Sequence, residues 1–146
     1  MRRYEAIAVL SVGLATIGGA LQAQTPTLYK RLGGYDALAA VTDDFLGRLA
    51  GDSVESRFFA GVSKDSQQRI RQLVVDQLCA ATGGPCVYIG RSMKTAHAGL
   101  GITSADWDRS VRLLSATLAK FNVPAAEQTE VLAAIASLKA DIVEKP

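Results

Sequence analysis

Residues 83–103 read GGPCVYIGRSMKTAHAGLGIT, and this stretch separates two long segments with a helical pattern. Its opening, Gly83-Gly84-Pro85, predicts the end of a helix, because glycine adopts the backbone bend at a helix terminus and proline cannot continue the helix. A short helical piece is expected around residues 93–98, and Thr103 is expected to cap the next helix. The same stretch contains His97, the single histidine of the chain.

Apolar residues recur with the helical period on both sides of this stretch. A short first turn is expected at residues 28–32, and Phe58-Phe59 falls in a short helical or turn segment. The four longer helices are predicted over residues 36–50 and 64–82, after Thr103, and after Pro124. Their apolar stripes are Leu38, Val41, Phe45 and Leu49; Ile70, Leu73, Val74 and Leu78; Trp107, Val111, Leu114, Leu118 and Phe121; and Val131, Ile135, Leu138 and Ile142. Each stripe needs another helix to cover it and no segment has a convincing strand pattern, so an all-α fold is predicted.

The composition fits one packed globular domain. The chain has 146 residues, of which 49% are hydrophobic and 21% are charged. The formal net charge is +2 and basic residues do not cluster, so no nucleic-acid partner is predicted. One histidine and two cysteines are few ligands for a metal cage built from side chains alone.

Residues 1–23 have the pattern of a secretory signal. Arg2 and Arg3 give a positive start, residues 6–21 form an apolar run, and Ala23 supplies a small residue at a cleavage point. The alternative is a retained membrane anchor, although the run is short for a span of about 20 residues. We therefore expect a signal peptide over 1–23, a single domain over 24–146, a periplasmic or secreted location, and no stable membrane insertion after cleavage.

A lone histidine such as His97 is compatible with several roles. In a helical protein it is most often an ordinary core or surface residue. Zinc is disfavoured, because it takes four protein ligands, or three and a water. Haem needs only one axial histidine, since the porphyrin supplies four nitrogens. The chain has no Cys-x-x-Cys-His motif, which excludes the usual covalent attachment of a c-type haem.

With the stretch around His97, three other motifs resemble the group 1 (N-type) truncated haemoglobins, a family of bacterial truncated globins. These motifs are Leu28-Tyr29-Lys30-Arg31-Leu32-Gly33-Gly34, Asp43-Asp44-Phe45 and Phe58-Phe59. The resemblance extends over about residues 27–143. It implies a shortened globin fold, a two-over-two helical sandwich around haem. It further implies non-covalent haem b with His97 as the proximal iron ligand, and a diatomic gas (oxygen, NO or CO) as partner.

The distal residues depart from this family's pattern. Many members place a tyrosine directly after the phenylalanine of the first long helix, where this chain has Leu46. The positions that bring a polar group over the iron are Ile70, Leu73 and Val74, none of which donates a hydrogen bond. Gln77, one turn further on, is the nearest polar candidate. Since a donor stabilises the negative charge on bound oxygen, we expect fast oxygen release. Leu73 also stands where some relatives supply a second side-chain ligand, so we expect a five-coordinate ferrous haem.

Several other residues are candidates for contact with haem. Phe45 and Met93 lie in the family motifs and would contact its face, as would Leu46, Ile70 and Val74 if they are more than core. Lys94 and Arg91 would pair with the propionates, or else lie on a solvated face. Tyr88 would lie at the rim of the haem, or else be an ordinary surface ring.

The pairing of the two cysteines stays open on sequence grounds. Cys79 and Cys86 flank the glycine turn, and two cysteines in an oxidising compartment often form a disulfide. The alternative is a pair of buried thiols that act as small apolar groups.

Two kinds of haem function follow from these residues. The first is reversible gas binding, for storage, transport or sensing, which makes the protein a carrier rather than an enzyme. The alternative is a haem enzyme, a nitric oxide dioxygenase or a peroxidase-like protein. Nitric oxide oxidation would require stable oxygen binding and an electron donor that the sequence does not identify. A haem-free helical interaction module is the remaining alternative.

Overall fold

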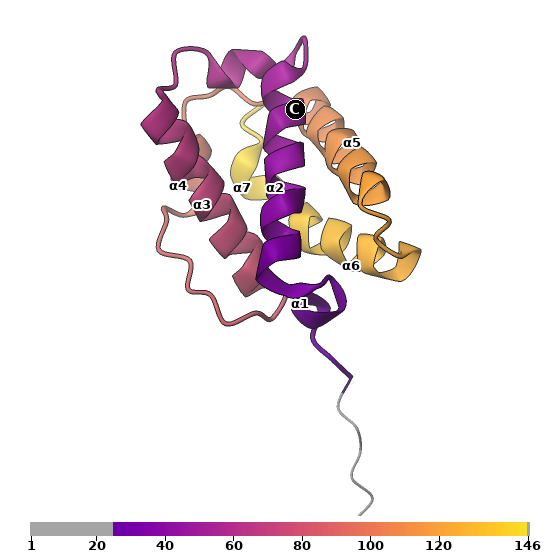
Figure 1. The fold of residues 1–146 in the computed structure, drawn as a ribbon. Helices are drawn as coiled ribbons and strands as arrows, with labels where there is room; N and C mark the ends of the chain where they lie inside the picture. The colour runs from indigo at the N-terminus through magenta and orange to yellow at the C-terminus, as the bar shows by residue number, and fades with distance from the viewer. Residues whose placement is uncertain (1–24, 146) are drawn as a thin grey trace, which may run out of the picture.

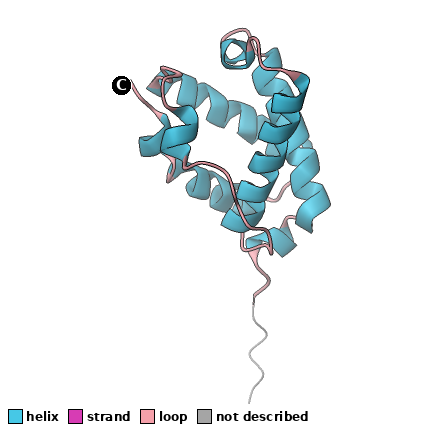
Figure 2. Cartoon of the chain, turned by 90° about the vertical axis from the view of Figure 1, so that its left-hand side faces the viewer, coloured by secondary structure: helices cyan, strands magenta, loops and turns pink. Residues whose placement is uncertain are grey.

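The computed structural model describes residues 25–145, so the predicted signal segment lies outside the described residues. The described part of the chain is helical, with no strand, as Figure 2 shows. The helices are α1 (Leu28–Arg31), α2 (Gly34–Gly51), the 3-10 helix η1 (Glu55–Phe59), α3 (Lys64–Ala81), α4 (Met93–His97), α5 (Ser104–Lys120), α6 (Ala125–Ala136) and α7 (Lys139–Ile142). No helix in this part is long and apolar enough to cross a membrane.

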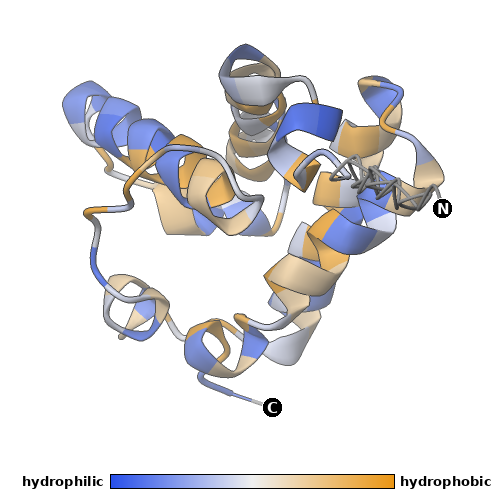
Figure 3. Cartoon of the chain, turned by 90° about the horizontal axis from the view of Figure 1, so that it is seen from below, coloured by the Kyte–Doolittle hydropathy of each residue, from blue (hydrophilic) through white to orange (hydrophobic). Residues whose placement is uncertain are grey.

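The long helices form two packed pairs. In Figure 1, α2 stands in the centre, with α3 on one side and α5 on the other, and it packs against both. α5 in turn packs against α6. Apolar and polar positions alternate along these helices with the helical period, as Figure 3 shows by hydropathy. The all-α prediction is therefore confirmed, and the pairs give a two-over-two arrangement.

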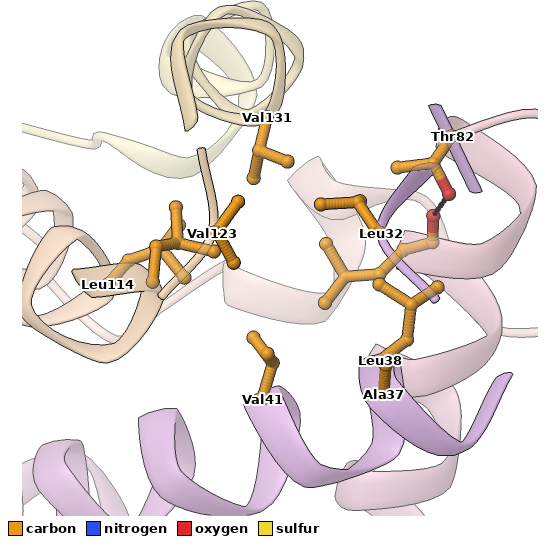
Figure 4. A pocket seen from close by; sticks show the side chains of 10 residues that line it. Leu32, Ala37, Leu38, Val41, Thr82, Leu114, Val123 and Val131 are labelled. Carbon is orange, nitrogen blue, oxygen red and sulfur yellow. Dashed lines mark hydrogen bonds between the residues drawn. The ribbon is translucent and has the colours of Figure 1, made fainter. Parts of the chain in front are cut away.

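The core lies where the two pairs meet. Two clusters of buried side chains fill it: Val41, Leu114, Leu118 and Val131, and next to them Leu38, Leu78 and Cys79. A small apolar cavity of about 20 Å³ remains in this core. Figure 4 shows side chains that line it, among them Leu38, Val41, Leu114 and Val131. The Thr82 hydroxyl, which faces it, donates to the Leu78 carbonyl oxygen at 2.7 Å and is thereby satisfied.

The helix ends follow the sequence signals. Gly83 has φ +80°, which is the left-handed conformation expected after a helix. A Cβ on Gly84 would lie 2.6 Å from the Tyr29 ring and 2.7 Å from the Cys79 sulfur, so only glycine fits. At the start of α5, the Thr103 side chain accepts from the Asp106 N–H and the Asp106 carboxylate accepts from the Thr103 N–H, which confirms the predicted capping box.

The corner between α2 and α3 is braced against α5 by charged groups. Asp52 accepts from Arg109 at 2.7 Å, and Asp106 accepts from Arg57 at 2.6 Å. Between them Glu55 is 2% exposed, and burial raises the pKa of its carboxyl group. These contacts place η1 firmly on the first turns of α5.

The last predicted helix is interrupted, and this corrects the sequence analysis. The stripe from Val131 to Ile142 suggested one helix, but α6 ends at Ala136 and α7 begins at Lys139. The Leu138 N–H reaches the Ile135 carbonyl oxygen at 2.9 Å, a three-residue step that tightens the helical turn. The Ser137 hydroxyl also donates to the Ala134 carbonyl oxygen at 2.6 Å. The break redirects the chain so that α7 packs against α4.

Candidate functional site

His97 ends the five-residue helix α4, which is capped at its start by the Ser92 side chain. The imidazole Nδ1 lies 2.8 Å from the Met93 carbonyl oxygen. A carbonyl oxygen can only accept, so Nδ1 donates its proton to it, and in the neutral imidazole Nε2 then keeps a lone pair. The ring is half-buried. His97 is therefore an oriented imidazole with its metal-binding nitrogen unused, the arrangement typical of a histidine ligand.

Helix α3 has two apolar stripes with different environments. Val75, Leu78 and Cys79 are buried. The second stripe, apolar Ile70, Leu73 and Val74 followed by polar Gln77, has the helical spacing of one face and is half-buried, with Val74 also packed against the core. The protein alone thus leaves an apolar helix face incompletely covered, which fits a large apolar group lying against it.

A cavity of about 270 Å³ continues from the end of this face. It lies between the last turns of α3, helix α6 and the turn that follows α6. The cavity is lined mainly by apolar groups: Gln77, Leu78, Ala81, Thr82, Val131, Ala134, Ile135, Ser137 and Leu138. Leu138, at one end of the lining, directly precedes α7, the helix against which α4 packs.

The other predicted contact residues fall into two groups. Phe45 and Leu46 are half-buried on α2, and Phe45 packs on the core. Met93 and Tyr88 are half-buried before or at the start of α4, close to His97 in sequence. The Tyr88 hydroxyl donates to the Arg91 carbonyl oxygen at 2.7 Å, which fixes the ring at the approach to α4.

Lys94 and Arg91 are exposed beside this ring, and neither forms an ion pair with a described residue. Both cations are thus free for an anionic group such as a propionate, or for solvent, as the sequence analysis left open.

Comparisons with known proteins decide the family. The profile described as "Bacterial-like globin" matches residues 27–144. Group 1 truncated haemoglobin GlbN of Mycolicibacterium paratuberculosis is 35% identical over 121 residues, which covers 83% of this chain and 87% of the relative. The chain belongs to the group 1 truncated haemoglobins.

Solved structures agree with this truncated haemoglobin assignment. The Fe(III) truncated haemoglobin of Tetrahymena pyriformis superposes with a TM-score of 0.74 at 28% identity, covering 81% of this chain and 98% of that one. The 2/2 haemoglobin of Synechococcus sp. PCC 7002, in the cyanomet state with covalently attached haem, superposes with a TM-score of 0.73 at 28% identity and the same coverage. Membership implies haem binding and a gas ligand, which the half-buried stripe of α3 and the free Nε2 of His97 both fit.

A disulfide joins the end of α3 to the segment before α4. Cys79 and Cys86 are bonded, with their Cα atoms 5.7 Å apart. This settles the pairing that the sequence left open. Because Cys79 is fully buried next to Leu78, the bond anchors the start of the loop that leads to His97. In this truncated haemoglobin the segment that leads to α4 is therefore tied covalently to the end of α3.

Asp43 and Asp44, which are adjacent on α2, lie in different environments. Asp43 is exposed and pairs with Arg71. The Asp44 carboxylate accepts from Lys120, from Arg48 at 2.6 Å and from Thr117 at 2.8 Å. These donors, Lys120 first, hold the pKa of Asp44 well below its usual range. Sequence patterns gave no signal for this cluster, because its partners come from α2 and α5.

Proposed function

We propose that this truncated haemoglobin binds one haem b non-covalently through Nε2 of His97 and reversibly binds a diatomic gas on the opposite face. The observation that carries the proposal is the hydrogen bond from His97 Nδ1–H to the Met93 carbonyl oxygen, 2.8 Å long. It fixes the tautomer and orientation in which an imidazole binds iron. When bound, haem supplies an iron with an open position for a small ligand.

Non-covalent attachment is supported by the state of the cysteines and by the histidine count. Cys79 and Cys86 are bonded to each other, so neither offers a thiol for a thioether link. His97 is the single histidine, so if it binds the iron no other histidine is left to form a covalent bond to the haem. The neighbour from Synechococcus carries a covalently attached haem, so this is a point on which we expect the two proteins to differ.

The distal residues favour gas binding over oxidative catalysis. Leu46, Ile70 and Val74 are half-buried and have no polar side-chain atom. Apolar side chains cannot donate a hydrogen bond to a ligand bound to the iron. The affinity for oxygen, which is the more polar ligand when bound, is therefore lowered more than the affinities for NO and CO. Leu73 likewise offers no second ligand, so the ferrous protein is proposed to be five-coordinate. Gln77, which lines the cavity, is the polar residue that follows Ile70, Leu73 and Val74 along this face of α3.

Export is part of the proposal. The signal pattern of residues 1–23 and the Cys79–Cys86 disulfide point the same way, because structural disulfides persist in oxidising compartments. We propose a periplasmic or secreted protein that functions after cleavage following Ala23. Mass spectrometry of the protein exported by an expressing bacterium tests this: a mature chain beginning at Gln24 supports it, and an uncleaved chain held in the membrane contradicts it.

The central test is an absorption titration with haem, in the ferric, ferrous and CO-bound forms. We expect saturation at one haem per chain and a five-coordinate ferrous spectrum. His97→Gly is expected to abolish this spectrum, and added imidazole is expected to restore it by taking the place of the missing ring. Restoration separates loss of the ligand from general damage to α4. Unsaturable binding, or a spectrum that is indifferent to the substitution, would refute the proposal.

A further inference from the structure

The C-terminal end of the chain lies against the loop that follows His97. This loop, residues 98–103, connects α4 to α5. The Glu144 and Lys145 N–H groups donate to the Ile102 carbonyl oxygen at 2.9 and 3.2 Å, and the Ser104 N–H donates to the Lys145 carbonyl oxygen at 3.1 Å. The tail is thus hydrogen-bonded to the loop like a short strand, with a bridge between Thr103 and Lys145.

The side chain of Glu144 adds a second set of contacts to the same loop. The Gly99 N–H donates to its Oε1 at 2.6 Å, and the Gly101 N–H donates to its Oε2. Both glycines have positive φ, +82° and +67°, so the loop turns sharply enough to aim two backbone N–H groups at one carboxylate. These bonds lower the pKa of the Glu144 carboxyl group, which is therefore charged at neutral pH.

Helix α4 needs such external support, because a helix of five residues is not stable by itself. The helix has no residue in the buried class, and it packs against α7, the element from which the tail continues. The position of His97 is therefore set largely by what holds the two ends of α4. Ser92 caps its start, and Glu144 holds the loop two residues beyond His97.

We propose that Glu144 is a positioning residue for His97: its carboxylate fixes the loop after α4 and thereby the distance and tilt of the imidazole relative to the haem iron. This inference rests on the proposed role of His97 as the axial ligand. The sequence alone gave no indication of it, because Glu144 and Gly99 are 45 positions apart.

The test compares holoprotein carrying Glu144→Ala, Glu144→Gln or the control Asp141→Asn. Asp141 is exposed on α7, so the control removes the same charge near the same end of the chain. Glutamine has one carbonyl oxygen, so it can accept from one glycine and not from both. Three quantities are measured: the frequency of the iron–histidine stretch in the ferrous state by resonance Raman, the rate of haem transfer to excess apomyoglobin, and amide hydrogen exchange at Gly99 and Gly101.

For Glu144→Ala we expect a shifted iron–histidine stretch, faster exchange at both glycines, and haem loss accelerated about tenfold, the lower end of what removal of a group that orients a metal ligand costs. Glu144→Gln is expected to lie between Glu144→Ala and the wild type, and Asp141→Asn to match the wild type. Faster haem loss with an unchanged iron–histidine stretch would show a merely structural role and overturn the inference. Identical behaviour of all variants would overturn it as well.

The failure of this inference is distinguishable from the failure of the proposed function. If His97 does not bind the iron, wild-type protein lacks the iron–histidine stretch from the outset. If His97 binds but Glu144 does not position it, the wild-type stretch is present and Glu144→Ala leaves it unmoved. If Glu144→Ala does not fold, as judged by circular dichroism, Glu144→Gln provides the same comparison with one of the two contacts retained.

Discussion

Reduction of the Cys79–Cys86 disulfide is expected to lower the free energy of unfolding of the apoprotein by about 2.4 kcal/mol. The bond closes a loop with a sequence separation of seven. Cross-linking a loop of that length removes about 8 cal/mol/K of chain entropy from the unfolded state, which gives this value at 25 °C. The effect is moderate because the loop is short. Because the disulfide lowers the entropy of the unfolded chain, its stabilising effect does not depend on any contact with haem.

The assay is equilibrium unfolding in urea, followed by circular dichroism, with and without a dithiol reductant. Since the slope for a small protein is about 1–3 kcal/mol/M, the midpoint is expected to fall by about 0.8–2.4 M on reduction. The apoprotein is used because bound haem would add its own stabilisation to the folded state. Cys79→Ala/Cys86→Ala is the control, since its unfolding must not respond to the reductant. If wild-type protein unfolds at the same urea concentration in both conditions, the entropic reasoning is refuted.

Two further predictions concern the distal wall and the charged cluster on α2. Leu46→Tyr is expected to slow oxygen dissociation roughly ten- to a hundredfold, because the tyrosine hydroxyl can donate a hydrogen bond to bound oxygen. The dissociation rate is measured by stopped-flow displacement of oxygen with CO. The control Leu46→Phe adds the ring without the hydroxyl and must leave the rate near that of the wild type. Asp44→Asn is expected to destabilise the protein at neutral pH, because Asp44 pairs with Lys120 and Arg48. The folded-state pKa of Asp44 lies below the usual 3.8, so this stabilisation is fully present above that value and is lost progressively as the pH falls toward the folded pKa. The difference in stability between the two proteins should therefore begin to shrink below about pH 4, and a constant difference down to about pH 2 would contradict the assignment.

The helices were predictable because their signals are local. The turn at Gly83 and the capping box at Thr103 depend on residues within a few positions of each other, and both formed as expected. The break between α6 and α7 was not predictable in this way. The apolar spacing of Val131, Ile135 and Leu138 continues across it, and only the packing of α7 against α4 gives the chain a reason to turn.

In the candidate site, too, only the features with a local sequence signal were predictable. His97 was found because an imidazole is conspicuous in a chain that has only one, and its short helix formed as predicted. The contacts of Asp44 with Lys120 and Thr117 were not predictable, because these partners lie more than 70 positions away in the sequence. Glu144 was missed for the same reason, since a carboxylate near a chain end has no motif that connects it to a distant glycine loop.

The family was recognised from the resemblance of short motifs. The sequence by itself further determined where the main helical stretches lie, apart from the break in the last one, and which residue is the candidate iron ligand. These features depend on short-range periodicity, on turn chemistry and on residue type. Only the tertiary structure decided that Cys79 and Cys86 are bonded, that the stripe from Ile70 to Gln77 stays half-covered, and that Glu144 holds the loop after His97. These features depend on which distant segments meet, and that is set by the packing of whole helices, not by any local pattern.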